Sequence, residues 1–314
     1  MYEPIVPSFL GVKHVDSADI QPVLPYIDWT YFFHAWRVSG NFKGIEKMCN
    51  CESCRQQFLS RFPLQEQEKA SVAWRLFHDA RELLGRLVTE QRLTLRSALC
   101  FLEARSDGDS ILFFDKGKVV LRMPTLRQQH PSERSSFCLS LSDFISPKSD
   151  YIGLFCVSVA GAQSLSEEFR RKGDDYSSIL VESVSDRLAE AFSEWLHRQV
   201  RKHIWGYAPE EELTLEEIRK CRYQGIRPAI GYPSLPDQSL IFEVGKILQL
   251  DKIGVQLTEN GAMRPNSTIC GLYISHPQSN YFMVGRIGED QLADYAERRG
   301  KSKEEMRRWL AGVL

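Results

Sequence analysis

The run Tyr223-Gln-Gly-Ile-Arg-Pro-Ala-Ile-Gly-Tyr-Pro-Ser-Leu-Pro-Asp237 follows directly on a short segment with helical periodicity. It holds three prolines and two glycines in fifteen residues, with Arg227 as its basic side chain. Proline fixes the backbone angle φ, and glycine lets a backbone approach a ligand closely. The run therefore predicts an ordered, extended loop, which is either a rigid ligand-binding loop or an elaborate turn.

Composition narrows the class of protein. The chain has 314 residues, 43% hydrophobic and 26% charged, as in a soluble globular protein of one large or two ordinary domains. A net charge of −1 provides no basic field for nucleic acid. No apolar run approaches the ~20 residues of a membrane span. The N-terminus lacks the features of a secretory signal, and eight scattered cysteines favour a reducing compartment, so we expect a cytoplasmic protein.

Hydrophobic periodicity predicts an α+β fold, in which an antiparallel sheet packs with long helices. We expect an irregular, proline-rich N-terminal segment over residues 1–25 and one domain over residues 26–314. Strand patterns separated by Asp-Gly and Lys-Gly turns occur at 98–104, 111–114, 119–123 and 151–159. Helical patterns occur at 66–94, 175–204, 215–222, 288–299 and 302–313.

Three acids share one face of the longest predicted helix. Asp186, Glu190 and Glu194 are spaced i, i+4 and i+8. Such a row is either a solvated helix face or one wall of a site. The aspartate at position 28 precedes an aromatic helical segment and could simply cap it. The pair Tyr281 and Phe282 could belong to the core.

Cys49-x-Cys51-x-x-Cys54 places three thiols within six residues. Such spacing suits zinc or an iron–sulfur cluster. No fourth ligand is evident nearby, so the favoured interpretation is a loop with free thiols and no metal. Metal binding is the alternative.

Several motifs give the chain a family resemblance. Arg227-x-x-x-Gly231-Tyr232-Pro233 resembles the S-adenosylmethionine-binding signature of the activation domain of cobalamin-dependent methionine synthase. The resemblance runs from about Tyr26 to the C-terminus and implies the fold of that domain. Its other matches are Tyr26-Ile-Asp-Trp-Thr30, Asp174-Asp-Tyr176, Asp186-Arg-Leu-Ala-Glu-Ala-Phe192, Trp205-Gly-Tyr-Ala-Pro209, and Ser275-His-Pro277 followed by Tyr281-Phe282.

The resemblance implies a site for S-adenosylmethionine. An arginine suits the ligand's carboxylate, and acidic groups suit its ammonium group or ribose diol. Tyr232 would lie toward cobalamin. Asp186 would face the partner and pair with the histidine that leaves cobalt. The chain departs from the family at Ile230, where a proline is usual, and at Arg264, where an aromatic residue is usual. The implied ligand residues are Asp28, Glu190, Arg227, Ala229, Gly231, Tyr232, Tyr281 and Phe282.

The implied function is reactivation. The chain lacks an Asp-x-His-x-x-Gly cobalamin motif, so cobalamin would be reached only through a partner, a corrinoid-binding methionine synthase module acting in trans. A flavodoxin-like or other donor would supply the electron. As a component of a methyltransferase system for methionine biosynthesis, the chain would not make methionine alone. The alternatives are a sensor of S-adenosylmethionine without catalysis, an activator of a different corrinoid methyltransferase, and a metal-linked electron-transfer partner.

Overall fold

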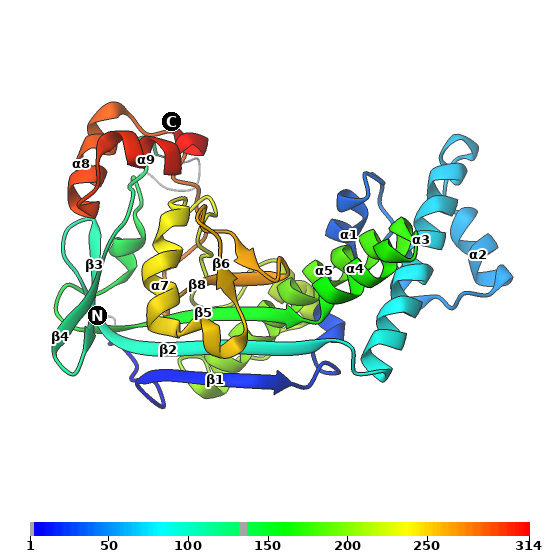
Figure 1. Ribbon diagram of the computed structural model, residues 1–314, viewed down its shortest axis with the longest axis horizontal. Helices are drawn as coiled ribbons and strands as arrows, with labels where there is room; N and C mark the ends of the chain where they lie inside the picture. The colour runs from blue at the N-terminus through cyan, green and yellow to red at the C-terminus, as the bar shows by residue number, and fades with distance from the viewer. Residues whose placement is uncertain (1–2, 132–136) are drawn as a thin grey trace.

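An antiparallel sheet of six strands forms the centre of the fold (Figure 1). The computed structural model describes residues 3–131 and 137–314. The strands follow the order β4-β3-β2-β5-β8, and β1 also pairs with β2. Their bounds are β1 Gly11–Ala18, β2 Thr94–Ser106, β3 Ser110–Asp115, β4 Lys118–Pro124, β5 Asp150–Ala160 and β8 Thr268–Tyr273. A separate two-stranded sheet consists of β6 (Gln256–Leu257) and β7 (Met263–Arg264).

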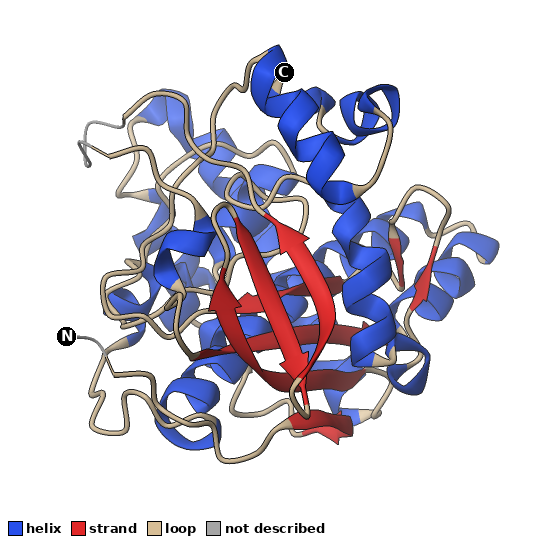
Figure 2. Ribbon diagram, turned by 90° about the vertical axis from the view of Figure 1, so that its left-hand side faces the viewer, coloured by secondary structure: helices blue, strands red, loops and turns tan. Residues whose placement is uncertain are grey.

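The long strand β2 organises the sheet. One of its edges pairs with β1 in its first half and with β3 in its second half, and the other edge pairs with β5 along its length. The β3–β4 hairpin runs at a steep angle to β2 and β5 (Figures 1 and 2). The turns at Asp107-Gly108 and Lys116-Gly117 are those expected from the sequence, and Gly108, Lys116 and Gly117 all have positive φ.

Side chains alternate between the two faces of the sheet. Leu99 and Phe101 of β2 belong to a core that also contains residues of α3 and α5. Their neighbours Ala98 and Cys100 belong to a second core, which includes residues of α7. Because both faces are covered by helices, the central strands read as nearly continuous apolar runs.

Nine α-helices are assigned in the described residues: α1 Trp29–Ala35, α2 Glu52–Leu59, α3 Leu64–Thr89, α4 Ala162–Arg171, α5 Asp175–Gln199, α6 Leu215–Arg219, α7 Ile241–Leu248, α8 Glu289–Arg299 and α9 Lys303–Trp309. A π-helical turn, Val200–Ile204, extends α5. Short 3-10 helices occur at Leu24–Tyr26, Ile45–Lys47, Leu141–Phe144, Gln238–Leu240, Leu250–Ile253 and Ala311–Val313. Within the described ranges, no helix combines the length and apolar character needed to cross a membrane.

The α+β prediction is confirmed, with local corrections. The expectation of an irregular segment over residues 1–25 is wrong for Gly11–Ala18, which forms β1. This edge strand is mostly polar and half-exposed, so its sequence lacks the apolar alternation of a strand. The helix expected over 66–94 ends at Thr89, because Gln91 adopts positive φ and turns the chain into β2. The domain boundary at residue 26 stays a prediction.

The elements that were not predicted include β8, α4 and α7. The strand β8 is buried along its whole length, so its sequence shows no alternation. The helices α4 and α7 are short, at 10 and 8 residues, and give only about two turns of periodicity. All three elements are determined by the neighbours against which they pack or pair, and their own sequence patterns are too weak to predict them.

Candidate ligand-binding site

The loop 223–237 lies along the edge of β8 that does not pair with β5. Ile226 exchanges two backbone hydrogen bonds with Ile274, at 2.9 and 3.0 Å. Leu272 N–H donates to Pro228 O at 2.9 Å, and Ile230 N–H donates to Cys270 O at 3.0 Å. This every-second-residue pattern turns the peptide groups of the intervening Arg227 and Ala229 away from β8. The predicted extended loop is therefore held as an additional short strand.

Two glycines permit this close approach. A Cβ atom on Gly271 of β8 would lie 2.4 Å from Pro228 O and 2.8 Å from Ala229 Cα. A Cβ atom on Gly231 would lie 2.1 Å from Gln238 Oε1, and Gly231 has φ +84. A larger residue at position 271 would displace the loop, and one at position 231 would strain the backbone at a positive φ. Gly231, predicted as a ligand residue, therefore has a demonstrable role in shaping the loop.

The face of α5 that carries Glu190 and Glu194 meets the loop. Arg227 Nη2 donates to Glu194 Oε2 at 2.9 Å, and both side chains are largely buried. Burial alone would lower the pKa of Arg227, but attraction to Glu194 outweighs it and holds the pKa well above its usual value. The solvated-face interpretation is wrong for Glu194. We did not predict it as a site residue, although its i+4 spacing from Glu190 was the available signal.

Two tyrosines complete the contacts around Arg227. The hydroxyl group of Tyr281 accepts a hydrogen bond from Arg227 N–H at 3.0 Å and lies 3.3 Å from the hydroxyl of Tyr223. Tyr232, half-exposed, donates to Glu190 Oε1 at 3.3 Å. Glu190, Arg227, Tyr232 and Tyr281 are thus brought together, as predicted.

A buried polar layer supports the site from behind. Arg201, fully buried, makes two hydrogen bonds of 2.8 Å to Glu211, and its guanidinium lies 4.2 Å from the Tyr223 ring centroid. His197 lies 3.1 Å from the hydroxyl of Tyr207. Burial lowers the pKa of His197 well below its usual value, and the nearby Arg201 adds to this effect. His197, Arg201 and Glu211 were not predicted as site residues, since their partners are set by tertiary packing.

The remaining predicted residues lie at different places around this group. Asp28 caps α1, with Oδ1 accepting from Thr30 N–H at 2.9 Å. Asp186 Oδ1 accepts from Ser267 Oγ at 2.7 Å, and burial raises the pKa of Asp186. Phe282 packs between two core clusters, so its predicted role in binding depends on the resemblance alone. The helix-cap interpretation is confirmed for Asp28 and leaves Oδ2 outside the cap.

The charged pair has unused hydrogen-bonding capacity. Arg227 Nε and Glu194 Oε1 are buried and have no hydrogen-bond partner within the described residues. A buried donor and a buried acceptor without partners are costly unless something satisfies them. A zwitterion does so directly, because a carboxylate accepts from Arg227 and an ammonium group donates to Glu194. The unpartnered donor of Arg227 and the unpartnered acceptor of Glu194 therefore suit the carboxylate and the ammonium group of an amino acid.

Two positions depart from the family pattern, and the structure describes both. Ile230 N–H donates to Cys270 O, a bond that proline could not make. Arg264 is exposed on β7. The loop is therefore tied to β8 by one hydrogen bond more than a proline at position 230 would allow.

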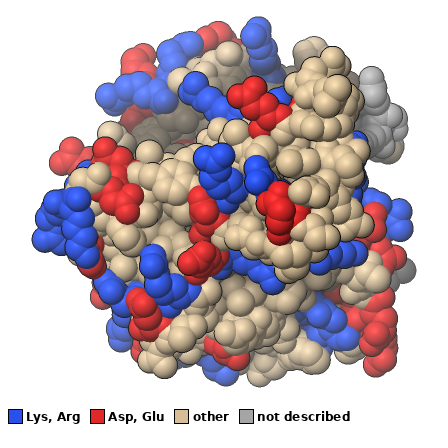
Figure 3. Space-filling model, turned by 90° about the vertical axis from the view of Figure 1, so that its right-hand side faces the viewer, with Lys and Arg blue, Asp and Glu red and all other residues tan. Residues whose placement is uncertain are grey.

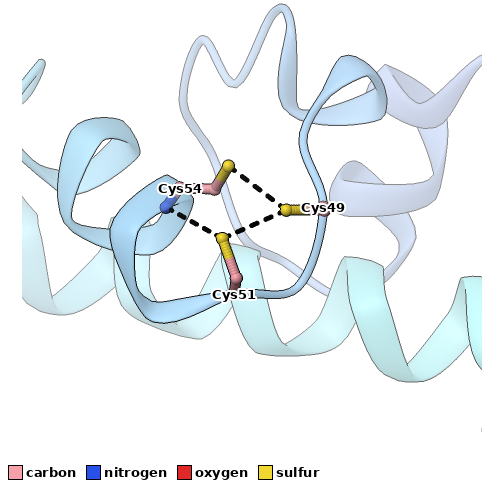
Figure 4. Close-up of side chains that lie close together, drawn as sticks. All are labelled: Cys49, Cys51 and Cys54. Atoms are coloured by element: carbon pink, nitrogen blue, oxygen red, sulfur yellow. Dashed lines mark hydrogen bonds between the residues drawn. The ribbon is translucent and has the colours of Figure 1, made fainter.

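The three clustered cysteines also converge in space. Cys49, Cys51 and Cys54 lie at the start of α2, with all three sulfurs within 4.8 Å of one another (Figure 4). The favoured expectation of a loop with free thiols is wrong for Cys54, which lies within α2, although every cysteine in the described residues is unbridged.

The fold and the loop define an α+β protein with a buried Arg227–Glu194 ion pair beside its sheet edge. The family described as "Vitamin B12 dependent methionine synthase, activation domain" matches residues 19–300, so the chain belongs to this family. It is also similar to the crystal structure of the MetH reactivation domain bound to AdoHcy. That match has a TM-score of 0.86 and 38% identity, and it covers 100% of this chain and 93% of the other.

Proposed function

We propose that this protein binds S-adenosylmethionine and serves as the reactivation module of a cobalamin-dependent methionine synthase system. The observation that carries the proposal is the buried Arg227–Glu194 pair with one unpartnered atom on each side, in a chain of the activation-domain family. The related reactivation domain was crystallised with AdoHcy, which is S-adenosylmethionine without its transferable methyl group.

The proposed contacts divide by chemistry. Arg227 would hold the ligand's carboxylate, and Glu194 or Glu190 its ammonium group. The Ala229 peptide, which faces away from β8, would supply a main-chain contact. Asp28 stays the predicted partner of the ligand's other polar groups, through Oδ2. The proposed set otherwise remains as predicted, with Gly231, Tyr232, Tyr281 and Phe282 along the loop and beyond it.

The chain's task in this proposal is placement. When bound, S-adenosylmethionine supplies an electrophilic methyl group on a sulfonium that is already a good leaving group, so no acid or base is required. One electron from a flavodoxin-like or other donor, together with that methyl group, converts cob(II)alamin to methylcobalamin and leaves S-adenosylhomocysteine. Holding the methyl group beside cobalt accelerates the transfer by proximity. The exposed Tyr232 would border the cobalamin, and Asp186 would face the partner's histidine.

Calorimetric titration with S-adenosylmethionine tests the site. We expect the wild type to bind, and Arg227→Ala to lose about 2–4 kcal/mol of binding free energy, since a charge-assisted contact disappears. Arg170→Ala is the control, because this exposed arginine on α4 makes only a surface ion pair. No binding to the wild type would refute the site. Equal affinity of wild type and Arg227→Ala would show that S-adenosylmethionine binds at a different site.

A reductive methylation assay separates the proposed role from its alternatives. The protein is mixed with a cobalamin-loaded methionine synthase module, a reductant and S-adenosylmethionine, and formation of methylcobalamin is followed by absorbance. Binding without methylation would favour a sensor. Methylation only on a different corrinoid protein would favour an activator of another methyltransferase. The free thiols of the chain are consistent with the proposed cytoplasmic location.

A further inference from the structure

The three cysteines at the start of α2 form a compact sulfur cluster. Cys49 Sγ lies 3.1 Å from Cys51 Sγ and 3.3 Å from Cys54 Sγ (Figure 4). Cys49 and Cys51 are exposed, and Cys54 is half-buried. The site therefore faces solvent, and an ion can reach it without any rearrangement of the core.

Local structure holds the sulfurs in place. Cys51 is the N-cap residue of α2, and its sulfur accepts from Cys54 N–H at 3.4 Å. Asn50, between the first two cysteines, accepts from Trp74 Nε1 of α3 at 3.3 Å, which ties the connecting turn to a long helix. Backbone N–H donors to sulfur and a fixed turn are the surroundings that orient thiolates for a metal.

The spacing distinguishes between the groups that three thiols can hold. A tetrahedral zinc ion with Zn–S bonds of about 2.3 Å has sulfurs about 3.8 Å apart, so the sulfurs, now 3.1 and 3.3 Å apart, would have to separate by about 0.5–0.7 Å to hold it. A cubane cluster needs wider separation, because each cysteine binds a different iron atom. A disulfide joins only two of the three thiols and would leave the third unexplained.

The cluster lies at the start of α2. The N-terminus of α2 is the positive end of the helix. The surface hollow beside Cys51 is lined by charges of both signs, with Arg55 and Arg75 alongside Glu52 and Asp79.

We propose that Cys49, Cys51 and Cys54 form a mononuclear site for a soft divalent cation of the zinc class, with three thiolate ligands and one open position. A closed structural site has four protein ligands, and the ligand group found within the described residues has only these three. Cys51 borders a hollow of about 320 Å³ that also contains His78. The open position is thus available to water, a thiol or an imidazole.

The site is independent of the proposed function. The helix α2 lies at the opposite end of the molecule from α8 and α9 (Figure 1). On the face at this end, acidic and basic side chains are intermixed (Figure 3). No hydrogen bond or ion pair recorded for the described residues links the cluster to the 223–237 loop. A failure of metal binding would therefore leave the S-adenosylmethionine proposal untouched, and the reverse also holds.

Titration of the fully reduced protein with Co²⁺ tests the proposal. We expect saturation at one ion per chain, with intense sulfur-to-metal charge-transfer bands and the visible bands of tetrahedral Co²⁺, and displacement of both by Zn²⁺. Each of Cys49→Ser, Cys51→Ser and Cys54→Ser should bind at least about tenfold more weakly. Added imidazole should shift the visible bands, because one position is open.

Cys221→Ser is the matched control, since Cys221 is exposed and outside the cluster. It should bind Co²⁺ like the wild type. Far-ultraviolet circular dichroism of each variant separates loss of ligands from loss of fold. Absence of charge-transfer bands with all thiols reduced would overturn the proposal. Equal binding by the triple variant would also overturn it. Anaerobic reconstitution that incorporates several iron and sulfide ions per chain would overturn the mononuclear assignment.

Discussion

Arg227 Nη2 lies 2.9 Å from Glu194 Oε2, and only 17% and 15% of the two side chains is exposed. The pair joins the first half of the 223–237 loop to the C-terminal part of α5. The pair connects a loop that the sequence marks clearly with a glutamate that the sequence marks only as one of three acids on a helix face. Four consequences of this packing can be measured.

Removing the glutamate should destabilise the protein as well as the site. Glu194→Ala leaves a largely buried guanidinium without its partner, and we expect a loss of about 3 kcal/mol in the free energy of unfolding. Urea denaturation measures this. Glu216→Ala removes a carboxylate from an exposed i, i+4 pair with Lys220, so its effect should stay within about 0.5 kcal/mol. Similar losses of unfolding free energy in the two variants would show that the buried pair stabilises the protein no more than an exposed pair.

Gly271→Ala should displace the loop. The added Cβ would lie 2.4 Å from Pro228 O, so β8 and the loop cannot keep their spacing. We expect a loss of about 1–3 kcal/mol in stability and weaker binding of S-adenosylmethionine. The matched control is Gly85→Ala in α3, where nothing lies within 4 Å of the new Cβ. That variant should be more stable than the wild type by about 0.5–1 kcal/mol, because alanine favours a helix. A stable Gly271→Ala variant with normal affinity would contradict this account.

The tyrosine at position 281 should act through its hydroxyl group. Tyr281→Phe keeps the ring but removes the acceptor of the Arg227 N–H bond, so the loop loses one anchor. We expect affinity for S-adenosylmethionine to fall by about fivefold, which corresponds to one hydrogen bond of about 1 kcal/mol. Calorimetry on Tyr281→Phe and on Tyr31→Phe, whose tyrosine is 60% exposed, provides the comparison. An unchanged affinity in both would remove Tyr281 from the site.

His197 should make stability dependent on pH. Burial keeps its pKa in the folded state well below the ordinary value of 6.5, and Arg201 and Arg227 add to that shift. Below pH 6.5 the unfolded chain takes up a proton that the folded protein refuses, so stability is lost as the pH falls from 6.5 toward the folded pKa. The slope attributable to one proton is at most about 1.4 kcal/mol per pH unit.

Urea denaturation at several pH values, on His197→Gln and wild type, isolates this effect. The variant should show a smaller loss of stability between about pH 6.5 and 5. His203→Gln, at an exposed position in the π-helical turn, should follow the wild type. If His197→Gln and wild type lose stability in parallel, protons on other groups account for the dependence.

The sequence was sufficient to predict local conformation. Periods of 3.6 and 2 residues predicted the long helices α3 and α5 and the strands β2 to β5, because each pattern records which side of one element is buried. Proline and glycine predicted an ordered loop at 223–237 for equally local reasons. The strand β8 escaped prediction, since burial on both faces removes the alternation on which such a prediction depends.

The partners across the fold were decided by tertiary structure alone. Arg227 and Glu194 are 33 residues apart, and nothing in either neighbourhood specifies the other. The polar Gly11–Ala18 segment becomes a strand only because β2 offers it a free edge. Even the three cysteines, close in sequence, converge because α2 begins at Cys51 and α3 holds Asn50. Periodicity and backbone preference depend on residues that are neighbours in the sequence. A binding site depends on packing of the core, which brings residues distant in the sequence into contact.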